Sequence, residues 1–259
     1  MRRAIAGLTA AVAIVAGLVT FDLTRSTAAT TAYDCPAVNG LPGHNDNGSG
    51  CLDPLWPTRA HGQYGNLAGP DVMLVGDSIT TLCKAYVTTR LQAQNLTYGV
   101  SYWSGRPTQA AVDWVLSLSV KPKTVVMAIG TNDIYNTPVM AAQIQRLVNG
   151  LAPHGTRIMW VDVRAERPSY AVADMRNSRA VNTQIWSAAG ITPVKWMGWF
   201  DEQPNRRSLY IDKGGVHPTN PGTPAVPNYP NGCDFWGGAV SPSVVAAAKA
   251  AKLKASTPR

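Results

Sequence analysis

The sequence predicts an α/β protein, a three-layer α/β/α sandwich with a mostly parallel five-stranded sheet. Short apolar runs alternate along the chain with longer segments of helical pattern, which is typical of parallel sheets covered by helices on both faces. The run at residues 123–129 (KTVVMAI) is apolar and rich in β-branched residues, like strands buried on both faces. With 259 residues, 45% hydrophobic and 15% charged, the chain is long enough for one sizeable core and has a globular composition.

The first half of the alternation begins with an apolar strand at residues 72–75, which ends at Gly76. A helix is expected over residues 80–94. A weaker strand at residues 97–101 then precedes a helix at residues 107–118. That helix starts with a proline, as first helical turns prefer.

The second half starts from the strand at residues 123–129, and the following helix is closed by Asn149-Gly150. Gly and Pro dominate residues 214–232, so no regular element is expected there. The remaining elements are expected, in chain order, as a helix at 138–148, a strand at 157–163, a helix at 170–189, an extended segment at 191–200 and an Ala-rich helix at 241–254.

Two N-terminal segments are expected to precede a single domain at residues 70–259. Residues 1–29 have a basic start, an uncharged and largely apolar stretch and then small residues, which indicates a cleaved signal peptide. An uncleaved membrane anchor is the alternative, since the apolar stretch approaches spanning length. Residues 30–69 are rich in Gly, Pro and Asn and are expected to form a loop-rich arm. The protein is therefore expected to be secreted or attached to the cell envelope, meeting a membrane only through an uncleaved N-terminal segment.

The net charge of +8 does not indicate a nucleic-acid partner. The basic residues are scattered and accompany no recognised nucleic-acid motif. The charge instead favours an anionic cell surface or an anionic substrate.

Four cysteines fit an oxidising compartment. No C-x-x-C pair is present, so zinc or thioredoxin-like chemistry has no support. Four cysteines allow three pairings. We favour Cys35–Cys51 and Cys83–Cys233, and the alternative is that some are free buried thiols.

Four loops carry residues able to do chemistry, in the order Ser, Gly, Asn, His. Loops that follow the strands of a parallel sheet share one edge, where ligands bind. The four segments can therefore converge there. They are Gly76-Asp77-Ser78, Trp103-Ser104-Gly105-Arg106, Gly130-Thr131-Asn132-Asp133 and Val216-His217-Pro218.

In this order the four segments resemble the blocks of the SGNH hydrolases, the GDSL-like esterase and lipase superfamily, over residues 70–222. The resemblance implies the flavodoxin-like SGNH fold. It also implies a serine esterase that cleaves an acyl ester without metal or cofactor. The form of the Ser104-Gly105-Arg106 loop is similar to secreted bacterial members, so an acyl ester of the cell envelope is the expected substrate.

The same resemblance assigns the expected roles. Ser78 is the nucleophile, and His217 accepts its proton and returns it to the leaving alcohol. The backbone N–H groups of Ser78 and Gly105 and the side-chain amide of Asn132 form the oxyanion hole. The alternative is a purely structural role for Ser78 as a helix cap, and the presence of the other three blocks disfavours that role.

The chain departs from the family at the residue that orients the histidine. The family places Asp three residues before His, and Gly214 stands at that position here. The nearest carboxylate is Asp212, five residues before His217. Two possibilities stay open: Asp212 completes a triad across a local insertion, or a backbone carbonyl orients the imidazole of a Ser–His dyad.

Three residues beside the motifs are candidate substrate-binding residues. Arg106 follows Gly105 and could meet an anionic substrate, although a solvated surface role is the default for such a residue. Trp103 could stack on a sugar, although aromatic residues more often pack in the core. Asp133 is also a candidate, and its alternative role is to shape its loop through backbone hydrogen bonds.

Two other functions use the same residues. An acyltransferase would form the same acyl intermediate and pass it to another alcohol. A catalytically weakened SGNH fold that binds envelope glycans is the rival from another class, and Gly214 at the family's Asp position is its direct support.

Overall fold

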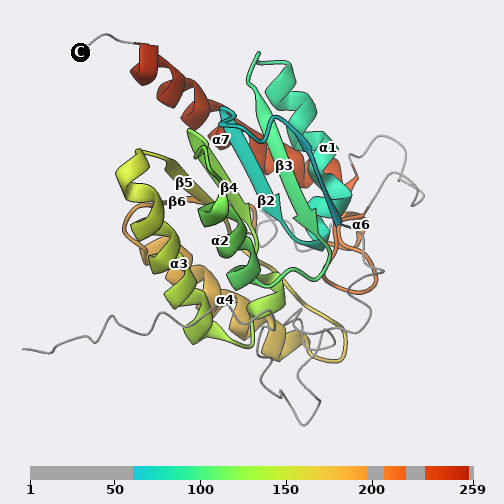
Figure 1. Cartoon of the computed structure of the whole chain (residues 1–259). Coiled ribbons are helices and arrows are strands. Elements are labelled where there is room, and N and C mark those ends of the chain that lie inside the picture. The colour runs from blue at the N-terminus through green and yellow to red at the C-terminus, as the bar shows by residue number, and fades with distance from the viewer. Residues whose placement is uncertain (1–60, 198–206, 220–230, 257–259) are drawn as a thin grey trace, which may run out of the picture. The chain divides into compact units, whose positions relative to one another are not determined.

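Apolar runs pair in parallel to form most of a six-stranded sheet with the strand order β1-β3-β2-β4-β5-β6 (Figure 1). The computed structural model describes residues 61–197, 207–219 and 231–256. The strands are β1 (His61–Gly65), β2 (Val72–Gly76), β3 (Tyr98–Trp103), β4 (Thr124–Ala128), β5 (Arg157–Val161) and β6 (Ile191–Val194). β1 pairs antiparallel with β3, and the other neighbours are parallel. The central strands β2 and β4 are buried along their whole length, as their apolar sequences predict.

Helices cover both faces of this sheet, so the three-layer α/β/α architecture is confirmed. α1 and α7 pack with one hydrophobic cluster, and α2, α3 and α4 pack with the other. Figure 1 shows α2 in front of the sheet and α7 passing behind it. The helices are α1 (Ser78–Gln92), α2 (Thr108–Ser117), α3 (Thr137–Leu151), α4 (Ala171–Ser187), α6 (Arg207–Tyr210) and α7 (Gly232–Ser256), with 3-10 turns η3 (Thr131–Asp133) and η4 (Ala152–His154).

The expected count of five strands is wrong, because residues 61–65 of the expected loop-rich arm form the edge strand β1. Its short sequence, HGQYG, has little strand signal of its own. Pairing with β3 supplies the missing stabilisation, because Tyr64 packs edge-on against Tyr98 and Tyr102 at centroid distances of 6.2 and 6.5 Å. The rest of the expected arm and the expected signal peptide lie outside the described residues.

The C-terminal helix is also longer than expected. α7 begins at Gly232, nine residues before the expected start, and Pro242 lies inside it. Gly237 in this first part allows the two helices to pack closely, since a Cβ on it would lie 2.7 Å from the Tyr86 Cβ of α1. A disulfide between Cys83 of α1 and Cys233 of α7 joins the same two helices. Cys35 and Cys51 lie outside the described residues.

Within the described part of the chain, no helix is both long and apolar enough to cross a membrane. The apolar segment near the N-terminus lies outside that part.

Candidate active site

Ser78 stands where β2 ends and α1 begins, at the carboxyl edge of the sheet. Asp77 caps the helix, and its Oδ1 accepts a hydrogen bond from the Ile79 N–H at 3.0 Å. Gly76 is required just before it, because a Cβ there would lie 1.8 Å from Thr80 Oγ1. The strand-to-helix turn is therefore tight, and it holds Ser78 at the first position of α1 with its side chain partly exposed.

His217 lies beside this serine, with its Nε2 2.9 Å from Ser78 Oγ. On the other side of the ring, Nδ1 is 3.5 Å from Asp212 Oδ2. The three side chains that the sequence analysis nominated are thus brought together in the order Ser, His, Asp, although the His–Asp contact is longer than a normal hydrogen bond. This is the arrangement of a nucleophile, a base and a group that orients the base.

A tight turn explains how Asp212 reaches the ring from five residues away. Ile211 and Pro218 form an antiparallel bridge, and the Asp212 N–H donates to the His217 carbonyl at 2.8 Å. Asp212 Oδ1 also lies 3.4 Å from the His217 N–H. The two ends of the turn are thereby paired, and the extra residues project between them as a loop.

Gly215 anchors that loop to the segment after β5. Its carbonyl accepts from the Glu166 N–H at 2.9 Å, and its φ of +75° lies in the left-handed region that favours glycine. A Cβ on Gly215 would lie 2.0 Å from the Glu166 carbonyl oxygen. Gly215 and Glu166 belong to none of the four motifs, although the Gly214-Gly215 pair in the sequence indicates an unusual turn.

Gly105 and Asn132, the other expected oxyanion-hole residues, lie on neighbouring loops that contact each other. Gly105 is buried and has a φ of +82°, which explains the choice of glycine. The Asn132 amide nitrogen donates to the Arg106 carbonyl at 3.2 Å and contacts Asp77 Oδ2 at 3.4 Å. A single amide therefore ties together the loops after β2, β3 and β4.

Two buried carboxyl groups support these loops, and both have raised pKa values. Burial raises the pKa of Asp77 to about 7; the Ile79 N–H opposes this shift, and the negative charge of Asp133 adds to it. Burial likewise raises the pKa of Asp133 to about 6, against hydrogen bonds from the N–H and hydroxyl of Thr108, both at 2.7 Å. Asp133 thus joins the loop after β4 to the start of α2. Thr108 is a second supporting residue that the motifs did not reveal.

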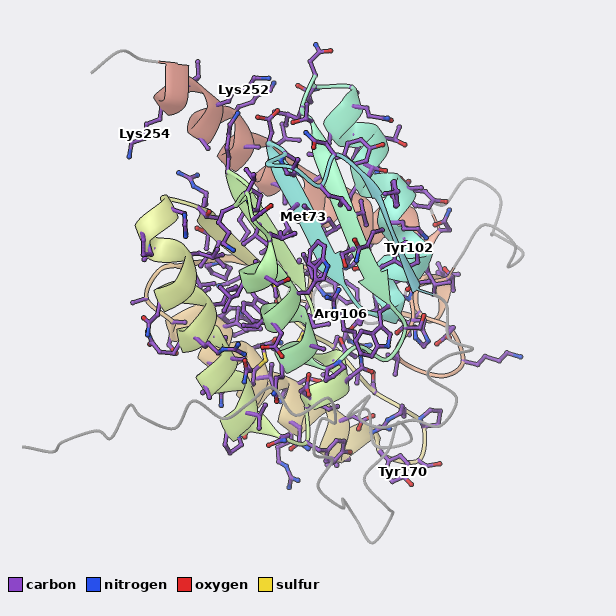
Figure 2. All side chains as sticks on the ribbon, in the orientation of Figure 1. Met73, Tyr102, Arg106, Tyr170, Lys252 and Lys254 are labelled. Atoms are coloured by element: carbon purple, nitrogen blue, oxygen red, sulfur yellow. A yellow bond between two sulfur atoms is a disulfide. The ribbon has the colours of Figure 1, made fainter. Side chains whose placement is uncertain are left out.

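The remaining candidates lie around the loop after β3. The Arg106 side chain is 3% exposed and donates to Ser101 Oγ at 3.0 Å, so it lies inside the protein and not on its surface. Figure 2 shows it between α2 and the end of β3. Trp103 is partly exposed, with its ring centroid 5.9 Å from the Arg106 guanidinium carbon. Asp133 is 4% exposed and faces Thr108.

No group of three or more His, Cys, Asp or Glu side chains is arranged to hold a metal ion among the residues that the structure describes. Ser78, His217 and Asp212 form the chemically distinctive group of the site: a serine hydroxyl in contact with an imidazole, and a carboxylate on the other side of the ring.

Comparison with known proteins agrees with this arrangement. The model of the GDSL-like Lipase/Acylhydrolase family matches residues 74–223, and the chain belongs to that family. Among curated proteins it is similar to the platelet-activating factor acetylhydrolase IB subunit alpha2 of Gallus gallus, with 29% identity over 157 residues, 57% of this chain. The matched region spans 62% of that relative's length.

Solved structures share the fold. An acetylxylan esterase from Geobacillus stearothermophilus has a TM-score of 0.51 and 20% identity, covering 68% of this chain and 94% of that one. An α/β-hydrolase enzyme from the metagenome of Lake Arreo, Spain, has a TM-score of 0.52 and 17% identity, covering 70% and 96%.

Proposed function

We propose that this protein is an exported serine esterase that removes short acyl groups from a carbohydrate or another cell-envelope component through an acyl-enzyme on Ser78. The observation that carries the proposal is the 2.9 Å contact between Ser78 Oγ and His217 Nε2. A serine hydroxyl is a weak nucleophile until an adjacent base accepts its proton.

In the acylation step, Ser78 Oγ bonds to the carbonyl carbon of the ester while its proton passes to His217 Nε2. The carbonyl π electrons move onto oxygen. The N–H of Ser78 is in the first turn of α1, where backbone N–H groups have no partner within the helix, so it can donate to this oxyanion. Asn132 supplies a second donor by exchanging its longer contact, at 3.4 Å to Asp77, for the oxyanion.

The tetrahedral intermediate then collapses and the bond to the alcohol oxygen breaks. His217 donates its proton to that oxygen, which leaves as the free alcohol. Water repeats the sequence: its oxygen attacks the acyl carbon, His217 accepts a proton, and Ser78 Oγ leaves and recovers it. Asp212 Oδ2, 3.5 Å from Nδ1, favours the imidazolium that exists between these steps.

Three observations support the finer parts of the proposal. The similar proteins include an acetylhydrolase and an acetylxylan esterase, whose names specify acetyl esters, and the second specifies a carbohydrate. The signal-like sequence of residues 1–29 supports export. The disulfide between Cys83 and Cys233 supports an oxidising compartment.

The test is intact-mass analysis after treatment with a fluorophosphonate probe. We expect one adduct on the wild type, none on Ser78→Ala, and one on Ser187→Ala, which removes a hydroxyl from the distant end of α4. Hydrolysis of p-nitrophenyl acetate should follow the same pattern. A folded wild type that takes no adduct and releases no p-nitrophenol would refute the esterase proposal and favour the glycan-binding alternative.

A further inference from the structure

A hollow of the surface lies beside the catalytic loops, between β1, the end of β3 and α2. Its volume is about 460 Å³, within the range of about 300–1,000 Å³ typical of small-molecule sites. α2 lies in front of the centre of the sheet, with β3 and β1 beyond it toward one edge (Figure 1). Gln63 of β1 and Trp114 of α2 contribute to opposite walls.

Two indole rings form part of the lining and are held in place by a buried cation. The guanidinium carbon of Arg106 is 5.9 Å from the ring centroid of Trp103 and 5.6 Å from that of Trp114. The same guanidinium donates to Ser101 Oγ at 3.0 Å, and the side chain is 3% exposed. Because the cation is fixed from behind, both rings are positioned before any ligand arrives.

Apart from Tyr102 of β3, the other described lining residues are small or polar. Gln63, Asp113 and Ser117 supply amide, carboxylate and hydroxyl groups, and no described lining residue is Leu, Ile, Val or Met. Asp113 is also paired with Arg146, so the polar rim carries no large excess of either charge. An alkyl chain would find no aliphatic side chain larger than Ala there. A sugar ring, with an apolar C–H face and a rim of hydroxyls, matches indole faces beside polar groups.

The hollow and the catalytic site share one loop. The Arg106 carbonyl accepts from the Asn132 amide at 3.2 Å, while its side chain lines the hollow. Trp103 is two residues from Gly105, a span of at most about 7 Å in an extended chain. A ligand that fills the hollow therefore lies within a short reach of the oxyanion hole.

We propose that this hollow is a sugar-binding subsite that holds a neighbouring unit of the glycan whose acyl group is cleaved at Ser78. The substrate class is thus an O-acylated oligosaccharide, rather than the ester of a lipid or of a small alcohol. This inference rests on the proposed esterase function.

The test compares two substrates on variants of the whole protein. p-Nitrophenyl acetate has no sugar unit to occupy the hollow. O-acetylated xylohexaose and O-acetylated peptidoglycan fragments each have sugar units that can occupy it. We expect Trp114→Ala to raise KM for at least one acetylated glycan at least tenfold more than KM for p-nitrophenyl acetate, because loss of a buried aromatic anchor typically costs about this factor. Trp114→Phe, which retains a ring, should recover part of the loss.

Two further variants separate binding from folding. Gln63→Ala changes an exposed side chain of β1, so it should fold normally and shift KM for the glycan in the same direction. Trp186→Ala removes an indole that is 43% exposed on α4, and it should leave KM unchanged for both kinds of substrate.

The outcomes distinguish the two proposals. Hydrolysis of p-nitrophenyl acetate with no turnover of either glycan, or equal effects of Trp114→Ala on both kinds of substrate, overturns the sugar subsite and leaves the esterase intact. No hydrolysis of any substrate together with no fluorophosphonate adduct overturns the esterase itself.

Discussion

Replacing Asp212 by Asn tests whether this carboxylate orients and stabilises the catalytic histidine. The substitution removes the negative charge and keeps the size of the side chain and an oxygen for the His217 N–H contact. The imidazolium formed during catalysis then lacks a carboxylate at 3.5 Å from Nδ1.

The magnitude follows from that distance. Two unit charges 3.5 Å apart attract by about 1 kcal/mol at the dielectric constant of water and by about 5 kcal/mol at an effective value of 20. Since 1.36 kcal/mol corresponds to a factor of ten in rate, these limits span about 5-fold to several thousand-fold. The His217 and Asp212 side chains are 36% and 41% exposed, so solvent screening applies. We expect a fall of about 10- to 100-fold in kcat/KM.

The assay is hydrolysis of p-nitrophenyl acetate, supported by the rate of fluorophosphonate labelling. Asp234→Asn is the matched control: its carboxylate is 38% exposed and paired with Arg90 at 2.6 Å, on α7. That variant should retain wild-type rates. If Asp212→Asn stays within threefold of the wild type in both assays, the triad reasoning is refuted and the histidine is oriented in a Ser–His dyad.

Three further predictions concern the support of the site. Asp133 has a folded-state pKa of about 6 against 3.8 for the free side chain, so its carboxyl ionises first in the unfolded chain and the stability of the wild type should fall between about pH 4 and pH 6. Because Asn does not ionise, the Tm of Asp133→Asn relative to that of the wild type should rise over the same interval. A constant difference between the two Tm values would contradict this prediction. Gly215→Ala should slow fluorophosphonate labelling at least tenfold, because its Cβ would meet a carbonyl oxygen at 2.0 Å, whereas Gly238→Ala has open space and should label normally; equal rates would show that the loop adapts. Replacing Cys83 and Cys233 together by Ala opens a link across 150 residues and should lower the free energy of unfolding by about 2–5 kcal/mol in urea, and an unchanged midpoint would refute that contribution.

The sequence alone was sufficient for the α/β class, for five of the six strands and for the order of the four motifs. These features depend on residues that are close together in the chain. A buried strand such as residues 124–128 is recognisable because every side chain in it must be apolar or small. A glycine before Ser78 is recognisable because the strand-to-helix turn leaves no room for a Cβ.

Only the tertiary structure decided the features that depend on distant partners. β1 forms because β3 offers an edge and tyrosines to pack against, and α7 starts early because α1 lies close beside it. The sequence indicates a surface position for Arg106, whereas in the structure α2 and the indole of Trp114 enclose its side chain. The role of the Asp212 carboxylate depends on the turn that brings it to His217, and His217 is itself 139 residues from Ser78 in the sequence. Local periodicity and motif spacing describe which conformations a segment favours, whereas a contact across such a separation exists only when the whole core has folded around it.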